Sequence, residues 1–89
     1  MIHKIKIHEK DAKEHLRGVK PWELRKNDRN YQIGDDIEFT IVDAYNKPTG
    51  HIYTRRIIDV FHGGVYGLQN GFCIITLGLE KTDQYIRKQ

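Results

Sequence analysis

Hydrophobic and polar residues alternate along most of the chain with a period of two, the pattern of strands that are buried on one face. Residues 3–8 show it first, with Ile5 and Ile7 on one face and Lys4 and Lys6 on the other. Segments rich in glycine, proline and asparagine separate the alternating stretches and predict turns. The other predicted strands cover residues 22–26, 36–45, 51–61 and 72–79.

Residues 9–18 follow a helical period instead. Ala12, Leu16 and, more loosely, Val19 fall on one side of such a helix. Gly18 comes just after its last turn, where glycine commonly ends helices. We therefore expect a short helix that covers one end of the sheet.

Two strands carry specific expectations about which side chains are buried. The strand that begins at residue 51 is expected to place Ile52, Ile58 and Val60 on one face. The last strand surrounds Cys73 with apolar neighbours, which predicts a buried, inert thiol. A lone cysteine of this kind suits a reducing compartment.

Five strands and one early helix predict a mainly β protein of the α+β class. Because exposed strand edges invite aggregation, we expect the sheet to close, or nearly close, into a small mixed barrel of five to six strands with one or two short helices. A chain of 89 residues has the size of one domain, so residues 1–89 are predicted to form a single domain. For the polar residues 80–89, an added strand, a helical turn and a loose tail all stay open.

The charge balance permits a nucleic-acid partner without requiring one. Lys and Arg total 15 against 12 Asp and Glu, for a formal net charge of +3. No run of about 20 apolar residues could span a membrane and no signal-peptide pattern is present, so we predict a cytoplasmic protein without a membrane partner. The five histidines lack the spacing of a zinc site, and no cofactor fingerprint occurs, so neither a metal nor a cofactor is predicted.

Residues 18–25 form a G-x-K-x-x-E-x-R motif where the predicted helix leads into the second strand. On a strand, Glu23 and Arg25 share one face and Trp22 lies on the other. An arginine fork matches phosphate, a lysine adds a point charge, and a carboxylate accepts hydrogen bonds from base amines. We therefore predict that Lys20, Glu23 and Arg25 bind nucleic acid at an open hollow; an internal ion pair is the alternative.

Further candidates surround this motif. Lys26 and Arg29 would widen a basic surface that follows phosphates, or form an ordinary solvated face. Trp22 would stack on a base, although its phase with the apolar residue two positions on favours a place in the core. Tyr66 and Gln69 belong to the glycine-rich connection before the last strand, and Tyr66 is the better candidate for stacking.

The motif, placed between the first helix and the second strand, resembles the ASCH domain of the PUA-like superfamily. All four fixed positions of that motif match, namely Gly18, Lys20, Glu23 and Arg25. The continuation of the motif and the segment 67–72 resemble a compact, mostly uncharacterised branch of bacterial and phage proteins. The resemblance covers residues 3–79.

This resemblance implies a small PUA-like β-barrel that binds RNA in a cleft beside the motif. One bacterial group of ASCH-like proteins consists of amidohydrolases that remove acyl groups from modified cytidine, using a lysine, a threonine and a later glutamate. Lys20 corresponds to that lysine, whereas Glu23 occupies the position of the threonine.

We therefore expect an RNA-binding or nucleotide-binding module whose affinity falls steeply with salt. The alternative from a different class is a hydrolase that acts on RNA or a modified nucleoside, with Glu23 as general acid or base and Lys20 as its partner. A second alternative is a small protein-interaction domain in which the motif is structural. The sequence predicts neither the identity of the RNA nor the oligomeric state.

Overall fold

The computed structural model describes residues 1–78 and 82–85. As predicted, the fold is mainly β with one short helix. The elements, in chain order, are β1 (Ile2–His8), α1 (Glu9–Leu16), β2 (Trp22–Lys26), β3 (Asp36–Val42), β4 (Pro48–His62), β5 (Phe72–Leu77) and β6 (Thr82–Tyr85).

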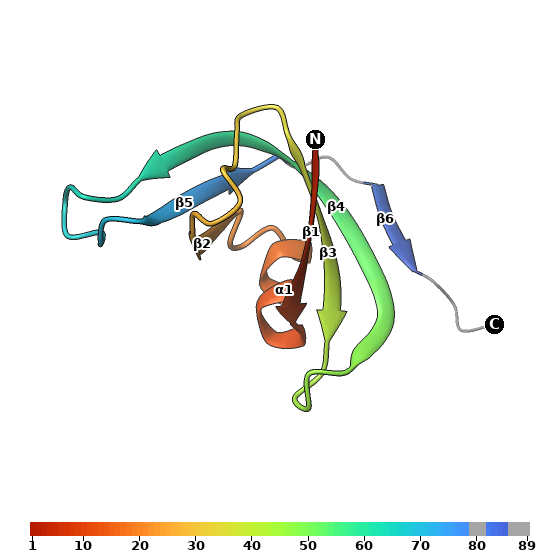
Figure 1. Ribbon diagram of the computed structural model, residues 1–89. Coiled ribbons are helices and arrows are strands. Elements are labelled where there is room, and N and C mark those ends of the chain that lie inside the picture. The colour runs from red at the N-terminus through yellow and green to blue at the C-terminus, as the bar shows by residue number, and fades with distance from the viewer. Residues whose placement is uncertain (79–81, 86–89) are drawn as a thin grey trace.

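The strands form one open mixed sheet (Figure 1). Its order is β1-β3-β4-β5-β2, with β6 paired to β4 off this path. β1 runs parallel to β3, and the other pairs are antiparallel. The long strand β4 arches over the molecule, because its first part pairs with β3 and its second part with β5. In the described part of the chain no ladder joins β1 to β2, so the predicted barrel does not close.

The core lies between the inner faces of the strands and α1. The predicted alternation holds in β1 and β3, where Ile5 and Ile37 are buried. Cys73 is buried in β5, as predicted. Phe39 stacks on Tyr53 with ring centroids 4.8 Å apart, which ties β3 to β4. Ala12 of α1 belongs to the same buried cluster, so the curved sheet packs against α1.

The prediction that Trp22 belongs to the core is wrong. Trp22 and Leu24 lie on the outer face of β2 and are 42% and 50% exposed. The inner positions of this strand belong to Glu23, which is buried, and Arg25, which is half-buried. The tertiary structure therefore inverts the usual rule that the apolar face of a strand is the buried one.

Two other expected faces also differ. In β4 the buried positions are Tyr53, Arg55 and Ile57, so Ile52 and Ile58 fall on the opposite face. The register shift between residues 57 and 59 then changes the phase, and Val60 packs against the core. In α1, His15 is buried beside Ala12, whereas Leu16 lies at the exposed side. The buried histidine has polar partners, described below, that make its place in the interior favourable.

α1 ends in a Schellman motif that sets the path of the chain into β2. The Gly18 N–H bonds to the His15 carbonyl at 3.0 Å. The Val19 N–H bonds to the Glu14 carbonyl at 3.2 Å. Gly18 has φ +76°, a conformation that glycine adopts without steric cost. The first fixed position of the G-x-K-x-x-E-x-R motif is therefore structural.

The end of the chain is described in part. Of the alternatives left open for residues 80–89, an added strand is observed over Thr82–Tyr85. Residues 79–81 and 86–89 lie outside the described residues, and so does the predicted extension of the last strand to Leu79. Within the described residues, no helix is long and apolar enough to cross a membrane.

Candidate functional site

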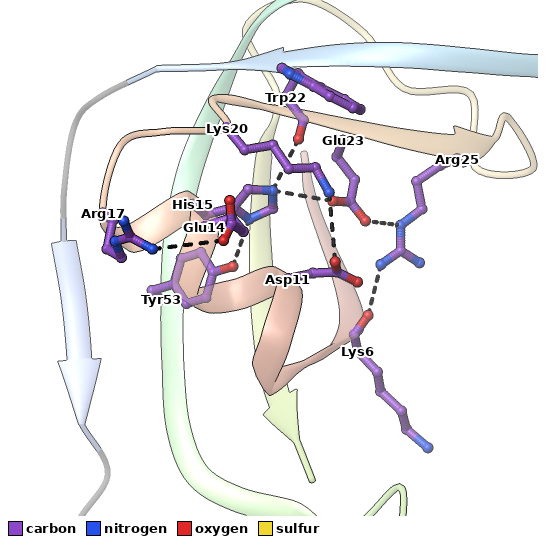
Figure 2. A network of polar contacts seen from close by, with 10 residues as sticks. All are labelled: Lys6, Asp11, Glu14, His15, Arg17, Lys20, Trp22, Glu23, Arg25 and Tyr53. Atoms are coloured by element: carbon purple, nitrogen blue, oxygen red, sulfur yellow. Dashed lines mark hydrogen bonds and ion pairs between the residues drawn. The ribbon is translucent and has the colours of Figure 1, made fainter. Parts of the chain in front are cut away.

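Glu23 is the buried centre of a polar network that reaches from α1 to the edge of the sheet (Figure 2). His15 Nε2 lies 3.2 Å from Glu23 Oε1, and Arg25 Nε donates to Glu23 Oε2 at 2.9 Å. At one end, Arg25 Nη2 donates to the Lys6 carbonyl at 2.8 Å. At the other end, His15 Nδ1 lies 2.7 Å from the Tyr53 hydroxyl. The network thus joins α1 and β4 to the facing edges of β2 and β1.

The surroundings of His15 determine its tautomer. Its Nε2 faces two acceptors, the Glu23 carboxylate and the Trp22 carbonyl at 3.1 Å, so Nε2 carries a proton. With the Nε2 proton directed at these acceptors, Nδ1 faces the Tyr53 hydroxyl, 2.7 Å away, and pairs with it. His15 therefore satisfies a carbonyl of β2, as Arg25 satisfies a carbonyl of β1.

The pKa of Glu23 lies below the ordinary value for a glutamate. Burial by itself raises this pKa, but the hydrogen bond with His15 and the positive charge of Arg25 outweigh burial. Glu23 is consequently ionised at neutral pH, and both of its oxygens are engaged. The internal ion pair that the sequence left open as an alternative is present in the structure.

Lys20, the other cation of the predicted trio, makes different contacts. Its Nζ lies 3.7 Å from Asp11 Oδ1 and 4.9 Å from the centre of the Trp22 ring. The prediction that Lys20, Glu23 and Arg25 together line one open hollow is wrong. Glu23 is enclosed, and Arg25 lines a hollow whose lining includes neither Lys20 nor Glu23.

A hollow of about 500 Å³ opens where β1 faces β2, and we call it the seam hollow. It lies between the two strands that end the sheet order, so it occupies the place where a closed barrel would have its last ladder. Its lining residues come from β1, β2, β3 and the loop after β2. They are Lys4, Ile5, Lys6, Arg25, Lys26, Asp28, Arg29, Tyr31 and Thr40.

The seam hollow is strongly basic. Among the described residues, its lining contains five lysines and arginines against one carboxylate, Asp28. Arg25 shares its charge with Glu23 behind it, which leaves four cations facing Asp28. The resulting formal charge equals the +3 of the whole chain. The positive charge of the protein is therefore concentrated at the seam.

Three of the sequence-predicted residues, Arg25, Lys26 and Arg29, meet in the seam hollow, whereas Tyr66 and Gln69 lie elsewhere. Both belong to the connection between β4 and β5, which projects away from β1 (Figure 1). Tyr66 is 93% exposed and its ring lies over Phe61, with centroids 6.3 Å apart. Gln69 is also exposed.

Sequence reasoning did not assign Lys4, Lys6, Tyr31 and Thr40 to the site. The alternation of β1 correctly placed Lys4 and Lys6 on its exposed face. The sequence carried no signal that β1 pairs with β3 on one side and leaves its other edge facing β2, since that pairing joins distant segments.

The chemistry available at the seam hollow is that of an anion site. Guanidinium and ammonium groups supply charged donors, and the Thr40 and Tyr31 hydroxyls add neutral ones. Within the described residues, no group of three or more His, Cys, Asp or Glu side chains lies close enough together to hold a metal ion.

Comparison with known proteins adds one assignment. The family model described as a domain of unknown function, DUF3850, matches residues 2–77. This range contains every described element except β6, including the whole seam hollow. None of the curated proteins matches the sequence significantly. The chain belongs to the DUF3850 family.

Proposed function

We propose that this protein binds RNA or a nucleotide through the seam hollow. The single observation that supports this most is the gathering of five cationic side chains, from β1, β2 and the following loop, around one open cavity. Such a surface attracts the phosphates of nucleic acid, because neutralising them releases bound counterions.

Arg25 is the motif residue that serves this function. Its Nε and one Nη2 donor are occupied by Glu23 and the Lys6 carbonyl, which hold the guanidinium in one orientation. The remaining N–H donors of the planar group are available to a ligand in the hollow. Glu23 therefore positions Arg25 and is not itself a contact of the bound nucleotide.

The resemblance of the motif to the ASCH domain supports the same proposal, since that domain is expected to bind RNA in a cleft beside the motif. The open sheet would then be a small PUA-like fold in which the seam between β1 and β2 serves as that cleft. In this reading, Lys26 and Arg29 extend the phosphate-binding surface beyond Arg25.

The geometry favours the two alternatives less. A hydrolase that used Glu23 as general base would need a free carboxylate oxygen, and both oxygens of Glu23 already have partners. A purely structural motif in a protein-interaction domain is expected beside a filled, flat surface, whereas a hollow opens next to Arg25.

Salt-dependent binding of a fluorescent single-stranded RNA, followed by anisotropy, tests the proposal. Affinity should fall steeply with salt, and Arg29→Ala should reduce the slope of log affinity against log salt by roughly 0.7, the value for one contact to a single strand. Lys47→Ala is the matched control, because it removes one exposed positive charge from the turn between β3 and β4.

If the two variants weaken binding equally, the seam hollow is not the site. If wild-type binding does not respond to salt, the phosphate-based proposal itself is wrong.

A further inference from the structure

Tyr31 forms the floor of the seam hollow. It lines the hollow, yet its side chain is 2% exposed. Its hydroxyl makes no hydrogen bond with any described residue. Among the described residues, every side-chain nitrogen or oxygen that is fully enclosed has a hydrogen-bond partner, so the Tyr31 hydroxyl is not fully enclosed. The hydroxyl is therefore the part of Tyr31 that reaches the open space.

The Tyr31 ring is held in place without help from its hydroxyl. Asn27 Oδ1 accepts a hydrogen bond from the Tyr31 N–H at 3.2 Å. The His3 ring packs edge-on against the Tyr31 ring at 4.8 Å between centroids, and Asp35 lies 2.8 Å from His3 Nε2. A fixed ring with an unused hydroxyl is a pre-organised hydrogen-bonding group, because little freedom is lost when a ligand binds it.

The Tyr31 hydroxyl is a donor at neutral pH. Burial raises the pKa of Tyr31, and the positive charges of Arg25 and Arg29 oppose this shift without outweighing it. The phenol therefore stays protonated. Because Arg25 and Arg29 also line the hollow, an anion seated above the hydroxyl would face two guanidinium groups and one neutral donor.

We propose that the seam hollow receives a phosphate monoester, the terminal phosphate of an RNA strand or of a nucleotide, with the Tyr31 hydroxyl donating to one of its oxygens. This inference rests on the proposed function and specifies its ligand. A monoester carries a charge of about −1.5 to −2 at pH 7, against −1 for an internal phosphodiester, so it matches the excess of cations better.

The test compares one RNA sequence in three forms, with a 5′-phosphate, with a 3′-phosphate and with hydroxyls at both ends, each labelled away from the tested end. Wild-type protein should bind one phosphorylated form at least about tenfold more tightly than the unphosphorylated form. Tyr31→Phe should remove most of that preference, because phenylalanine cannot donate to a phosphate oxygen. Tyr45→Phe, which alters an 82% exposed tyrosine outside the hollow, should keep the full preference.

Thermal unfolding of Tyr31→Phe provides the folding control. Because the hydroxyl has no partner among the described residues, the variant should unfold at the wild-type temperature. Competition by a nucleoside monophosphate and by inorganic phosphate then identifies the source of the monoester. The nucleotide should compete at concentrations where inorganic phosphate does not.

Equal binding of all three RNA forms would overturn the inference and leave RNA binding itself intact. A preference that survives Tyr31→Phe would overturn the role of Tyr31. Inorganic phosphate competing as well as the nucleotide would overturn recognition of a nucleotide. Failure of every RNA to bind, with Tyr31-dependent binding of the monophosphate, would reject RNA as the partner and support the monoester site.

Discussion

Glu23 is a charged residue in the interior, and its partners explain why it stays charged there. A buried carboxylate is costly unless hydrogen bonds and opposite charges compensate for lost hydration. His15 and Arg25 contact the carboxylate at 3.2 and 2.9 Å, and Arg25 supplies the opposite charge. The carboxylate in turn fixes the direction of Arg25, so a residue that touches no ligand decides how the site presents its guanidinium.

Glu23→Gln should lower the free energy of unfolding at pH 7 by about 1–3 kcal/mol, since it removes hydrogen bonds to a charged group. The pKa of Glu23 is lower in the folded protein than in the unfolded chain, so its contribution is present above the unfolded pKa and is lost as pH falls through the folded pKa. Wild type should therefore lose more stability than the variant from about pH 5 downward. Urea unfolding at several pH values measures this difference.

Glu14→Gln is the matched control, because Glu14 is a partly exposed carboxylate 3.8 Å from Arg17. Its stability should follow that of wild type at every pH. A Glu23→Gln variant with the same acid sensitivity as wild type would contradict the assigned ionisation of Glu23.

At the scale of elements, the end of α1 controls where the motif begins. Gly18 provides the left-handed residue of the Schellman motif, and an added Cβ would meet no atom within 4 Å. A substitution there is therefore opposed by backbone conformation and not by packing. The same short turn leads to Pro21. The Pro21 carbonyl accepts a hydrogen bond from the Leu77 N–H, and this bond aligns β2 with β5.

Gly18→Ala should destabilise the protein by about 1–2 kcal/mol, the cost of a left-handed conformation for a residue with a Cβ. Gly18→Asn should cost less, because asparagine tolerates this conformation. Thermal unfolding of both variants checks the order. Loss of RNA affinity in Gly18→Ala at a temperature where the variant is fully folded would show that this motif position contacts the ligand.

At the scale of the whole molecule, the sheet stays open and a side chain spans the seam. Arg25 reaches from β2 to the carbonyl of Lys6 in β1, at the point where a further backbone ladder would close a barrel. The cations along both walls repel one another when the hollow is empty. An anionic ligand between them would relieve that repulsion, so a bound anion should stabilise the folded protein.

Arg25→Lys should weaken both stability and RNA binding, although it keeps the charge, because lysine cannot donate to Glu23 and to the Lys6 carbonyl in the same fork geometry. We expect a loss of about 1–3 kcal/mol in unfolding free energy. Hydrogen exchange of the β1 amides should also become faster. Arg17→Lys, at an exposed arginine of α1's end, should change none of these measurements; unchanged exchange in Arg25→Lys would contradict the bridging role.

Much of this architecture follows from local sequence pattern. Period-two alternation predicted the buried faces of β1, β3 and β5. The helical spacing of apolar residues predicted α1, and Gly18 predicted where it ends. The same alternation placed Glu23 and Arg25 on one face of β2, and the structure confirms their contact. These features depend on neighbours within a few positions, so a single sequence contains them.

The tertiary structure alone decided which face of β2 is buried and where the cations meet. Glu23 faces inward because its partner there is His15 of α1, which is itself held by Tyr53 of β4. Trp22 lies on the opposite face of the strand and therefore points outward. Lys6 lies beside Arg25 because β1 pairs in parallel with β3 and leaves its other edge free. Such pairings join segments far apart in the chain, and hydrophobic periodicity carries no information about which distant strands become neighbours.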